Sequence, residues 1–418
     1  MFKMRKRRMP DIATFRYSDI SSLRQRYVAY HKLNCYCDVT HNTSDALIFR
    51  MYQAKESDYM QCDPIKPSRN HLLTIQDLAW NRVSPQEAEH HEGGMLIIGA
   101  PGTGKSHLCL QLIARLRAEG FRIEVLSKTW VASQRIDGVT ADHWVQRYLN
   151  RGTPNVDYIL IDEISQLDIA LLTQFTRLLM LTDAPKFILS GDFNQFAPIG
   201  NMWRNTAVAE DAFERSSLIH TMASGNIIKL EQCMRSESSL FDFYSALLNI
   251  SIKEAMLHTH RFNYQGECRF YLVISHCRRV QINRKQNEIH SRGKQTLYIG
   301  SHNTRAKRHS QQSMHLYEGI ELFGCTSKGE RLGIRNGVLY TVSKIIDEHI
   351  FVNDKMFDKE QIKSIFRLSY ARTYASCQGC EFDTQPVCLC DTKHPQFSIK
   401  HLYVGLSRCR NAELIRVE

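Results

Sequence analysis

Gly99-Ala100-Pro101-Gly102-Thr103-Gly104-Lys105-Ser106 is the stretch that decides the fold of this 418-residue chain. It matches the phosphate-binding pattern G-x-x-x-x-G-K-[ST] and lies between the apolar run Met95–Ile98 and the amphipathic run Leu108–Arg117. This order predicts a strand, a glycine-rich turn and a helix. Glycines let the backbone curl with its N–H groups turned inward, at the positive end of the helix. Lys105 would then reach the β and γ phosphates of a nucleotide, and the Ser106 hydroxyl would hold Mg²⁺.

The composition points to a polyanionic partner. The chain has 54 Lys and Arg residues against 43 Asp and Glu, a formal net charge of +11. An excess of this sign suits nucleic acid, although a mildly basic enzyme would have the same balance.

The sequence carries no sign of export or membrane insertion. No apolar run approaches the roughly 18 residues of a membrane span. The basic start Met1–Arg8 lacks the apolar segment of a secretory signal. The 13 cysteines, an odd number, are scattered through apparent strands and helices. We therefore expect a soluble protein of a reducing intracellular compartment, the nucleus or the cytoplasm, with no membrane partner.

From residue 93 to about 228, apolar strand candidates alternate with helical stretches. The candidate strands are Met95–Ile98, Ile123–Ser127, Tyr158–Ile161 and Phe187–Ser190. Such alternation with short connections predicts an α/β fold whose parallel sheet is covered by helices on both faces. Ligands of these sheets bind at the carboxyl ends of the strands.

The rest of the chain is less regular. Residues 229–418 repeat the alternation less cleanly, with strand candidates at Phe270–Ser275 and His401–Val404. Residues 319–353 show short β runs separated by turns, which predicts a small β insert. Residues 1–92 carry no motif and are interpreted as an accessory region of unknown fold.

Polar residues follow two of the candidate strands directly. Asp162 would hold Mg²⁺ and Glu163 would polarise the attacking water. Gln195, in the turn Gly191-Asp192-Phe193-Asn194-Gln195, has an amide that can orient water against the γ-phosphate. Each motif alone would also suit a solvated strand end or a polar loop. Their shared position after strands of one sheet favours the catalytic interpretation.

This order of motifs resembles that of superfamily 1 helicases of the RecD-like and PIF-like branch, over about residues 93–418. Later segments continue the resemblance. Leu230–Arg235 is similar to the segment whose arginine reaches the γ-phosphate from the second motor domain. Tyr403–Arg408 is similar to the last motif, with Arg408 as the arginine finger, and Tyr370–Gly379 to the motif that couples nucleic acid to ATP.

The resemblance implies an architecture and an activity. It implies an ATP-binding RecA-like domain at 93–228 and a second RecA-like domain at 229–418, with a small β-barrel insert at about 319–353. It implies an ATP hydrolase that moves along single-stranded nucleic acid, DNA rather than RNA and from 5′ to 3′, alongside replication or repair proteins. A compact core of this kind also suits a large DNA virus or a mobile element.

The resemblance also implies roles for particular residues. Residues 99–106 would bind ATP, and Ser106 with Asp162 would hold Mg²⁺. The residues expected to carry catalysis are Lys105, Glu163, Gln195, Arg235 and Arg408. Those expected to contact nucleic acid are Thr140, Thr373 and Gln378. The chain departs from the family at Ala375-Ser376, where a His-Lys pair is usual, so a basic contact to phosphate is missing there.

Several alternatives stay open. Viral RNA helicases of superfamily 1 share the motif order, and a nucleotide-switched binding or packaging factor without unwinding would also use such a cleft. The spacing of Cys377, Cys380, Cys388 and Cys390, with His394 nearby, has the look of a zinc cluster. Because the first two cysteines flank the coupling motif, semi-buried thiols are favoured. Trp130 and Trp144 would stack on bases or fill the core.

Overall fold

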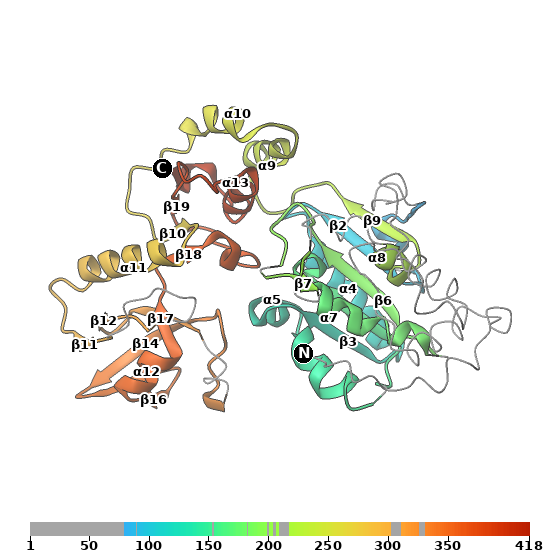
Figure 1. Ribbon diagram of the computed structural model, residues 1–418, viewed down its shortest axis with the longest axis horizontal. Helices are drawn as coiled ribbons and strands as arrows, with labels where there is room; N and C mark the ends of the chain where they lie inside the picture. Colours follow the sequence, from blue (N-terminus) through green and yellow to red (C-terminus); the bar gives the residue numbers. More distant parts are fainter. Residues whose placement is uncertain are drawn as a thin grey trace.

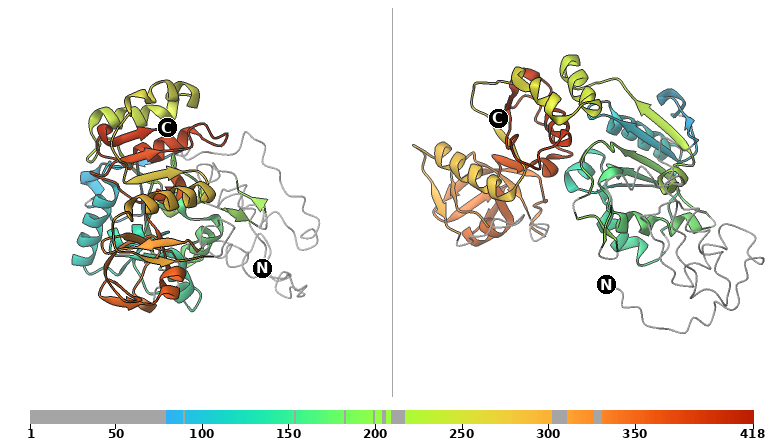
Figure 2. Two further views of the ribbon diagram at one scale, coloured as in Figure 1. Left: turned by 90° about the vertical axis from the view of Figure 1, so that its left-hand side faces the viewer. Right: turned by 45° about the horizontal axis from the view of Figure 1, so that its top comes forward.

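The computed structural model describes residues 79–88, 90–152, 154–181, 183–198, 200–203, 206–208, 217–301, 311–325 and 331–418. Two α/β lobes lie side by side, and a smaller β sheet continues from the second lobe (Figures 1 and 2). The predicted accessory region falls mostly outside the described residues. Of its described part, strand β1 (Asn81–Arg82) and helix α3 (Pro85–Ala88) belong to the first lobe.

The first lobe is built on a seven-stranded parallel sheet, in the order β1-β9-β2-β6-β5-β3-β4. All four strands predicted for this region are confirmed. The strands that follow β1 are β2 (Met95–Gly99), β3 (Ile123–Ser127), β4 (Val139–Thr140), β5 (Tyr158–Asp162), β6 (Lys186–Gly191) and β9 (Asn226–Leu230).

Helices cover both faces of this sheet, as the alternation predicts. Ile97 and its neighbours on one face pack against α4 (Lys105–Ala118). Leu96, one residue earlier, faces the opposite side and packs in a cluster with α6 (Ala141–Trp144) and α7 (Ile169–Phe175). The lobe therefore has two apolar layers, because successive side chains of a strand point to opposite faces.

The second lobe has a four-stranded parallel sheet in the order β18-β10-β19-β20. Its strands are β10 (Phe270–Val273), β18 (Ala371–Thr373), β19 (Val387–Leu389) and β20 (Ile415–Val417). Helices α9 (Ser238–Ala246) and α13 (Ile399–Leu406) share one core cluster with this sheet.

The predicted strand at His401–Val404 is wrong, because these residues lie inside α13. Residues 402–406 are all buried, so the helix presents apolar side chains on nearly every side. A short apolar run of this kind cannot be told from a buried strand by its periodicity.

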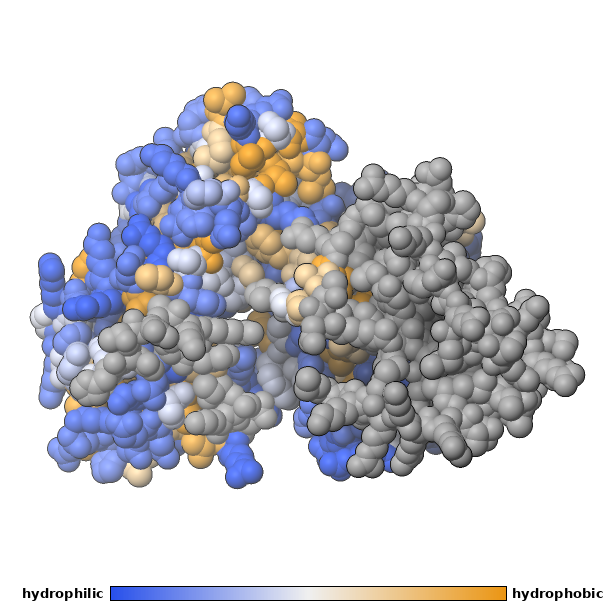
Figure 3. Space-filling view, viewed as in Figure 1, coloured by the Kyte–Doolittle hydropathy of each residue, from blue (hydrophilic) through white to orange (hydrophobic). Residues whose placement is uncertain are grey.

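Helix α11 (His276–His290) lies on the other face of the second sheet, where Ile282 shares a cluster with Tyr271 and Val273 of β10. Its inner face is held by amides: Asn283 accepts from the backbone N–H of Ala371 at 2.8 Å, and Asn287 accepts from that of His315 at 2.7 Å. Arg278 and Arg284 are exposed, and Arg284 pairs with Glu288 at 2.9 Å. Much of the surface over this lobe is hydrophilic (Figure 3).

The β insert is a five-stranded antiparallel sheet in the order β16-β15-β14-β13-β17. Its strands are β13 (Glu321–Gly324), β14 (Leu339–Ile346), β15 (His349–Val352), β16 (Lys355–Phe357) and β17 (Phe366–Leu368). The sheet runs past residue 353 because β17, after helix α12 (Lys359–Ile365), returns to pair with β13. Among the described residues nothing pairs edge strand β16 with β17, so a closed barrel is not confirmed.

No described helix is both long and apolar enough to cross a bilayer. This agrees with the short apolar runs in the sequence.

His401 should make folding stability depend on pH. Burial, and after it His394, lowers its pKa to about 4, and its ring packs on Phe397 and on Phe196 of the first lobe. A lowered His pKa means that stability is present above about pH 6.5 and lost as the pH falls toward 4. We expect about 1–2 kcal/mol of loss after allowing for partial exposure.

The measurement is the midpoint of thermal unfolding between pH 7 and pH 4.5. His401→Gln should flatten the acid limb relative to the unmodified chain. His258→Gln is the control, because His258 lies at the end of helix α10 (Ile252–Leu257) and outside this aromatic cluster. Equal acid slopes in the unmodified chain and His401→Gln would rule the assignment out.

Candidate nucleotide-binding site

The phosphate loop follows β2 and opens α4 at Lys105. Gly102 and Gly104 have φ angles of 88° and 89°, which side-chain-bearing residues rarely adopt, so the loop needs glycine at both positions. The Lys105 Nζ donates to the carbonyl oxygens of Gly99 at 2.7 Å and Ala100 at 3.0 Å. The lysine therefore folds across its own loop and holds its ammonium where phosphates would lie.

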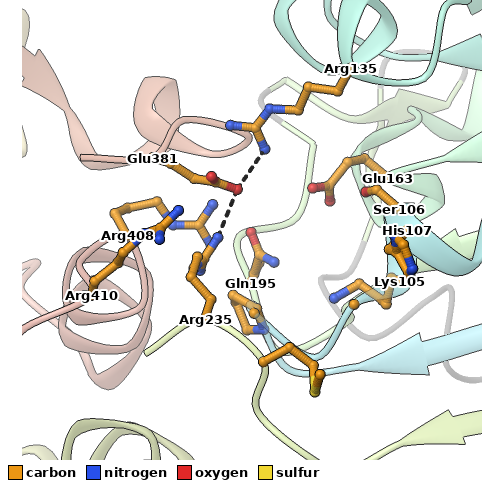
Figure 4. A pocket seen from close by; sticks show the side chains of 14 residues that line it. Lys105, Ser106, His107, Arg135, Glu163, Gln195, Arg235, Glu381, Arg408 and Arg410 are labelled. Atoms are coloured by element: carbon orange, nitrogen blue, oxygen red, sulfur yellow. Dashed lines mark hydrogen bonds and ion pairs between the residues drawn. The ribbon is translucent and has the colours of Figure 1, made fainter. Parts of the chain in front are cut away.

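A cavity lies beside this loop and is lined from both lobes (Figure 4). All five residues predicted to carry catalysis line it, together with five of the eight loop residues. The lining residues are Pro101, Gly102, Gly104, Lys105, Ser106, His107, Arg135, Glu163, Gln195, Met234, Arg235, Glu381, Arg408 and Arg410. The other loop residues support it, because Gly99 and Ala100 accept from Lys105 and Thr103 Oγ1 donates to the Ala100 carbonyl at 2.8 Å.

The residues predicted to hold Mg²⁺ lie together. The Ser106 hydroxyl donates to Asp162 Oδ2 at 3.1 Å, and Asp162 is buried at the carboxyl end of β5. Paired hydroxyl and carboxylate oxygens are the hard donors that Mg²⁺ accepts, usually with water and phosphate oxygens completing its shell. The donor set fits the ion.

Glu163 follows at a strained backbone position, with φ at 55°. Its side chain points into the cavity, across from the arginines (Figure 4). Burial, and then the neighbouring Asp162 carboxylate, raises the pKa of Glu163, while Lys105 and Arg408 act in the opposite direction. A buried carboxylate whose pKa is raised suits the acceptance of a proton from water.

Gln195 is 3% exposed and its amide is only half satisfied. Its Nε2 donates to Asp192 Oδ2 at 3.2 Å, whereas Oε1 has no hydrogen-bond partner within the described part of the chain. A buried unpaired amide oxygen is costly unless a ligand or water uses it. The same Asp192 oxygen accepts from the hydroxyl of Tyr403 in α13 at 2.8 Å, which ties this turn to the second lobe.

Arg408 is a buried cation without a carboxylate. It is 3% exposed, and its guanidinium donates to neutral oxygens, the carbonyls of Val404 at 3.3 Å and Cys380 at 3.4 Å and the Ser407 hydroxyl at 3.2 Å. No ion pair to it is present among the described residues. Burying a charge without a counter-ion is unfavourable, so the position is suited to an anionic ligand.

Arg235 approaches the cavity from the segment that joins the lobes. It forms an ion pair with Glu381 at 2.8 Å and donates to the Ser407 carbonyl. Burial, and then the positive charge of Arg408, lowers the pKa of Arg235, and Glu381 opposes this shift. The two arginines therefore lie close together at one wall, where they repel each other unless anions are near.

The second lobe also contacts the phosphate loop itself. The Met234 backbone N–H donates to the Gly102 carbonyl at 2.8 Å, and the Tyr244 hydroxyl of α9 donates to the Pro101 carbonyl at 2.8 Å. These hydrogen bonds hold the phosphate loop against the opposite wall of the cavity.

Sequence reasoning missed Arg135, Glu381, Arg410, His107 and Met234. Arg135 ends helix α5 (Trp130–Arg135) in the first lobe, and Glu381 follows the coupling segment in the second. Neither residue belongs to a sequence motif that indicates catalysis or nucleotide binding. Arg410 lies two residues after the predicted finger and pairs with Asp383 at 2.6 Å.

The three residues predicted to contact nucleic acid are all nearly buried and have partners within the protein. Thr140 caps α6 by accepting from the His143 N–H, and Thr373 caps the short helix Tyr374–Cys377. Gln378 donates from Nε2 to the carbonyl of Phe196 in the first lobe at 3.3 Å. Their contact with nucleic acid stays a prediction.

The two tryptophans lie in different environments. Trp144 is fully buried and stacks on Phe175, so it belongs to the core. Trp130 instead lies under the guanidinium of Arg335 of the insert, 4.3 Å from the ring centre.

The alternative zinc cluster is not assembled among the described residues, and Cys377, Cys380, Cys388 and Cys390 are buried thiols, as favoured. Cys388 Sγ lies 3.4 Å from Cys390 Sγ, and Glu418 is close enough to share an ion with them. The Cys377 thiol donates instead to the Tyr374 carbonyl. Glu418 is already paired with Arg416 at 3.1 Å.

Part of the chain is similar in sequence to known proteins. A family model described as an AAA domain matches residues 85–226. A segment of the chain is 35% identical over 119 residues to the ATP-dependent DNA helicase PIF1 of Trypanosoma brucei brucei (strain 927/4 GUTat10.1). That match covers 25% of this chain and 13% of the relative, so the chain corresponds to a small part of that protein.

Solved structures of Pif1 proteins share the fold. Bacteroides Pif1 bound to ssDNA superimposes with a TM-score of 0.58 at 16% identity, covering 80% of this chain and 91% of that one. Pif1 helicase from Candida albicans gives a TM-score of 0.56 at 16% identity, covering 78% and 90%. The likeness therefore includes both lobes.

Proposed function

We propose that this chain, a superfamily 1 protein that is Pif1-like in its fold and motif order, is an ATP-dependent DNA helicase. One observation carries the proposal. The cavity brings the phosphate loop, Glu163 and Gln195 of the first lobe opposite Arg235 and Arg408 from beyond it. Such an arrangement places catalysis between two lobes, so that movement of one lobe relative to the other would open or close the site.

In this proposal, the first lobe binds and aligns the reactants. The inward N–H groups of the loop and Lys105 would hold the phosphates. Ser106 and Asp162 would hold Mg²⁺, which would supply positive charge against the phosphates. Gln195 orients the attacking water through its free amide oxygen, and Glu163 takes its proton.

Arg235 and Arg408 supply the positive charge that stabilises the transition state, as an arginine finger does. Because they come from the other side of the cavity, hydrolysis depends on closure of the lobes. Release of the products then opens the cavity again, and this cycle is what a motor requires.

The track we propose is single-stranded DNA, followed from 5′ to 3′. The names of two similar proteins support DNA over RNA. One is an ATP-dependent DNA helicase, and the structure of the other was solved with bound ssDNA. The net charge of +11 suits either polymer. Thr140, Thr373 and Gln378 are the proposed contacts, and replication or repair proteins are proposed partners.

The test compares ATP hydrolysis without nucleic acid, with an oligo-dT strand and with an oligo-U strand. Unwinding is then measured on duplexes with a 5′ tail or a 3′ tail. We expect stimulation by the DNA strand and unwinding of the 5′-tailed duplex. Stimulation by RNA alone would make the chain an RNA helicase, and ATPase without stimulation or unwinding would exclude a motor.

A further inference from the structure

Glu381 occupies the centre of the cavity wall and binds two arginines at once. Its Oε1 atom lies 2.8 Å from Arg235 Nη1 and 3.1 Å from Arg135 Nη1 (Figure 4). Arg135 belongs to the first lobe, whereas Glu381 and Arg235 lie beyond it. A single carboxylate oxygen therefore connects the two walls of the cavity.

The charges of the cavity make this carboxylate a competitor for phosphate. Five cations line the cavity, Lys105, Arg135, Arg235, Arg408 and Arg410, against two carboxylates, Glu163 and Glu381. Arg235 is only 13% exposed, so its pairing with Glu381 is partly shielded from water. Phosphate oxygens bind guanidinium groups in the same forked geometry as carboxylates do, so the two anions compete for the same donors.

The position of Glu381 in the chain links this competition to nucleic acid. It lies three residues after Gln378. Gln378 donates to the carbonyl of Phe196, the residue that follows Gln195 in the chain. Gly379 between them has a φ of 75°, a conformation that turns the segment sharply. Residues 378–381 thus reach the first lobe at both ends, through Phe196 and through Arg135.

We infer that Glu381 is a positioning residue that holds Arg235 and Arg135 away from the γ-phosphate until its segment shifts. This inference rests on the proposed function, because it assigns the release of Arg235 to nucleic acid bound along residues 373–378. A γ-phosphate must displace the carboxylate to reach the arginines. ADP, which has no γ-phosphate, competes much less.

The test measures the affinity of a non-hydrolysable ATP analogue and of ADP by calorimetry, for the full chain and Glu381→Gln. Gln keeps the shape of the side chain and removes its charge. We expect the analogue to bind about tenfold more tightly to the variant and ADP to change less than about twofold. Arg135→Met should act in the opposite direction and weaken the analogue relative to ADP, because Glu381 keeps its charge and is left to Arg235 alone. The double variant should be non-additive.

Asp157→Asn is the matched control, because Asp157 also holds an arginine, Arg122 at 2.7 Å, but outside the cavity lining. It should leave both affinities unchanged. If Glu381→Gln fails to fold by thermal unfolding, Arg135→Met tests the same contact from the other lobe. An unchanged ratio of the two affinities, or equal weakening of both ligands, would overturn the inference.

A second readout separates this inference from the proposed function. Glu381→Gln should raise ATP hydrolysis in the absence of DNA several-fold, so that the stimulation by single strands falls. A chain that DNA does not stimulate at all would contradict the proposed motor while leaving the affinity test intact. Normal stimulation in Glu381→Gln, with the unmodified chain also stimulated, would show that Glu381 does not couple the two sites.

Discussion

Lys105→Ala is expected to lower ATP hydrolysis by roughly a thousandfold or more, because it removes the cation that faces the β and γ phosphates. Among the described residues, the ammonium of the lysine hydrogen-bonds to two loop carbonyls, at 2.7 and 3.0 Å, so its loss should leave the fold intact. Phosphate release at saturating ATP gives the rate, and nucleotide binding should weaken as well.

Lys229→Ala serves as the control for this substitution. Lys229 lies on β9 of the same sheet but pairs with Glu231 at the surface, with 62% of its side chain exposed. Its removal should leave the rate unchanged. Full activity in Lys105→Ala would mean that the glycine-rich loop does not bind the reacting phosphates.

Arg408→Ala should stop turnover while sparing nucleotide binding. An arginine that contacts only the developing charge contributes about 10³ to 10⁵ in rate, and little to binding of the ground state. The buried position of Arg408, held by neutral oxygens, fits this role. Arg408→Lys should recover little, because an ammonium cannot reproduce the forked donors of a guanidinium.

The measurements are single-turnover hydrolysis and affinity for the non-hydrolysable ATP analogue. Arg122→Ala is the control. Arg122 directly precedes β3 and so lies at the amino-terminal ends of the parallel strands, whereas the phosphate loop lies at their carboxyl ends. Thermal unfolding checks that Arg408→Ala retains its fold. Loss of analogue binding in parallel with turnover would assign Arg408 to ground-state binding instead, and an unchanged rate would remove it from catalysis.

The first lobe was predictable because its signals are local. An apolar strand buried on both faces, a glycine pair at positive φ and a helix beginning at Lys105 follow one another within about twenty residues. Each constrains the next. The position of Asp162, Glu163 and Gln195 at the ends of two strands could also be predicted from the sequence. Residues at the carboxyl ends of parallel strands must meet at one edge.

The second lobe was less predictable because its strands are short and one of its helices, α13, is largely buried. The apolar run 401–404 suits a strand or a buried helix equally, and packing against the sheet of the second lobe made it α13. Strand β17 joins the insert only by returning to β13 across more than forty residues. No local sequence pattern predicts such a pairing.

By itself, the sequence determined that a phosphate-loop motif, the Asp162-Glu163 carboxylates and the Gln195 amide lie along one sheet, because each follows directly after one of its strands. Only the tertiary structure decided what faces them. Arg135, Arg235 and Glu381 come from three distant segments, and their shared contact exists because the two lobes pack against each other. Coulomb attraction between such groups depends on distance in space, and spacing along the chain does not report it.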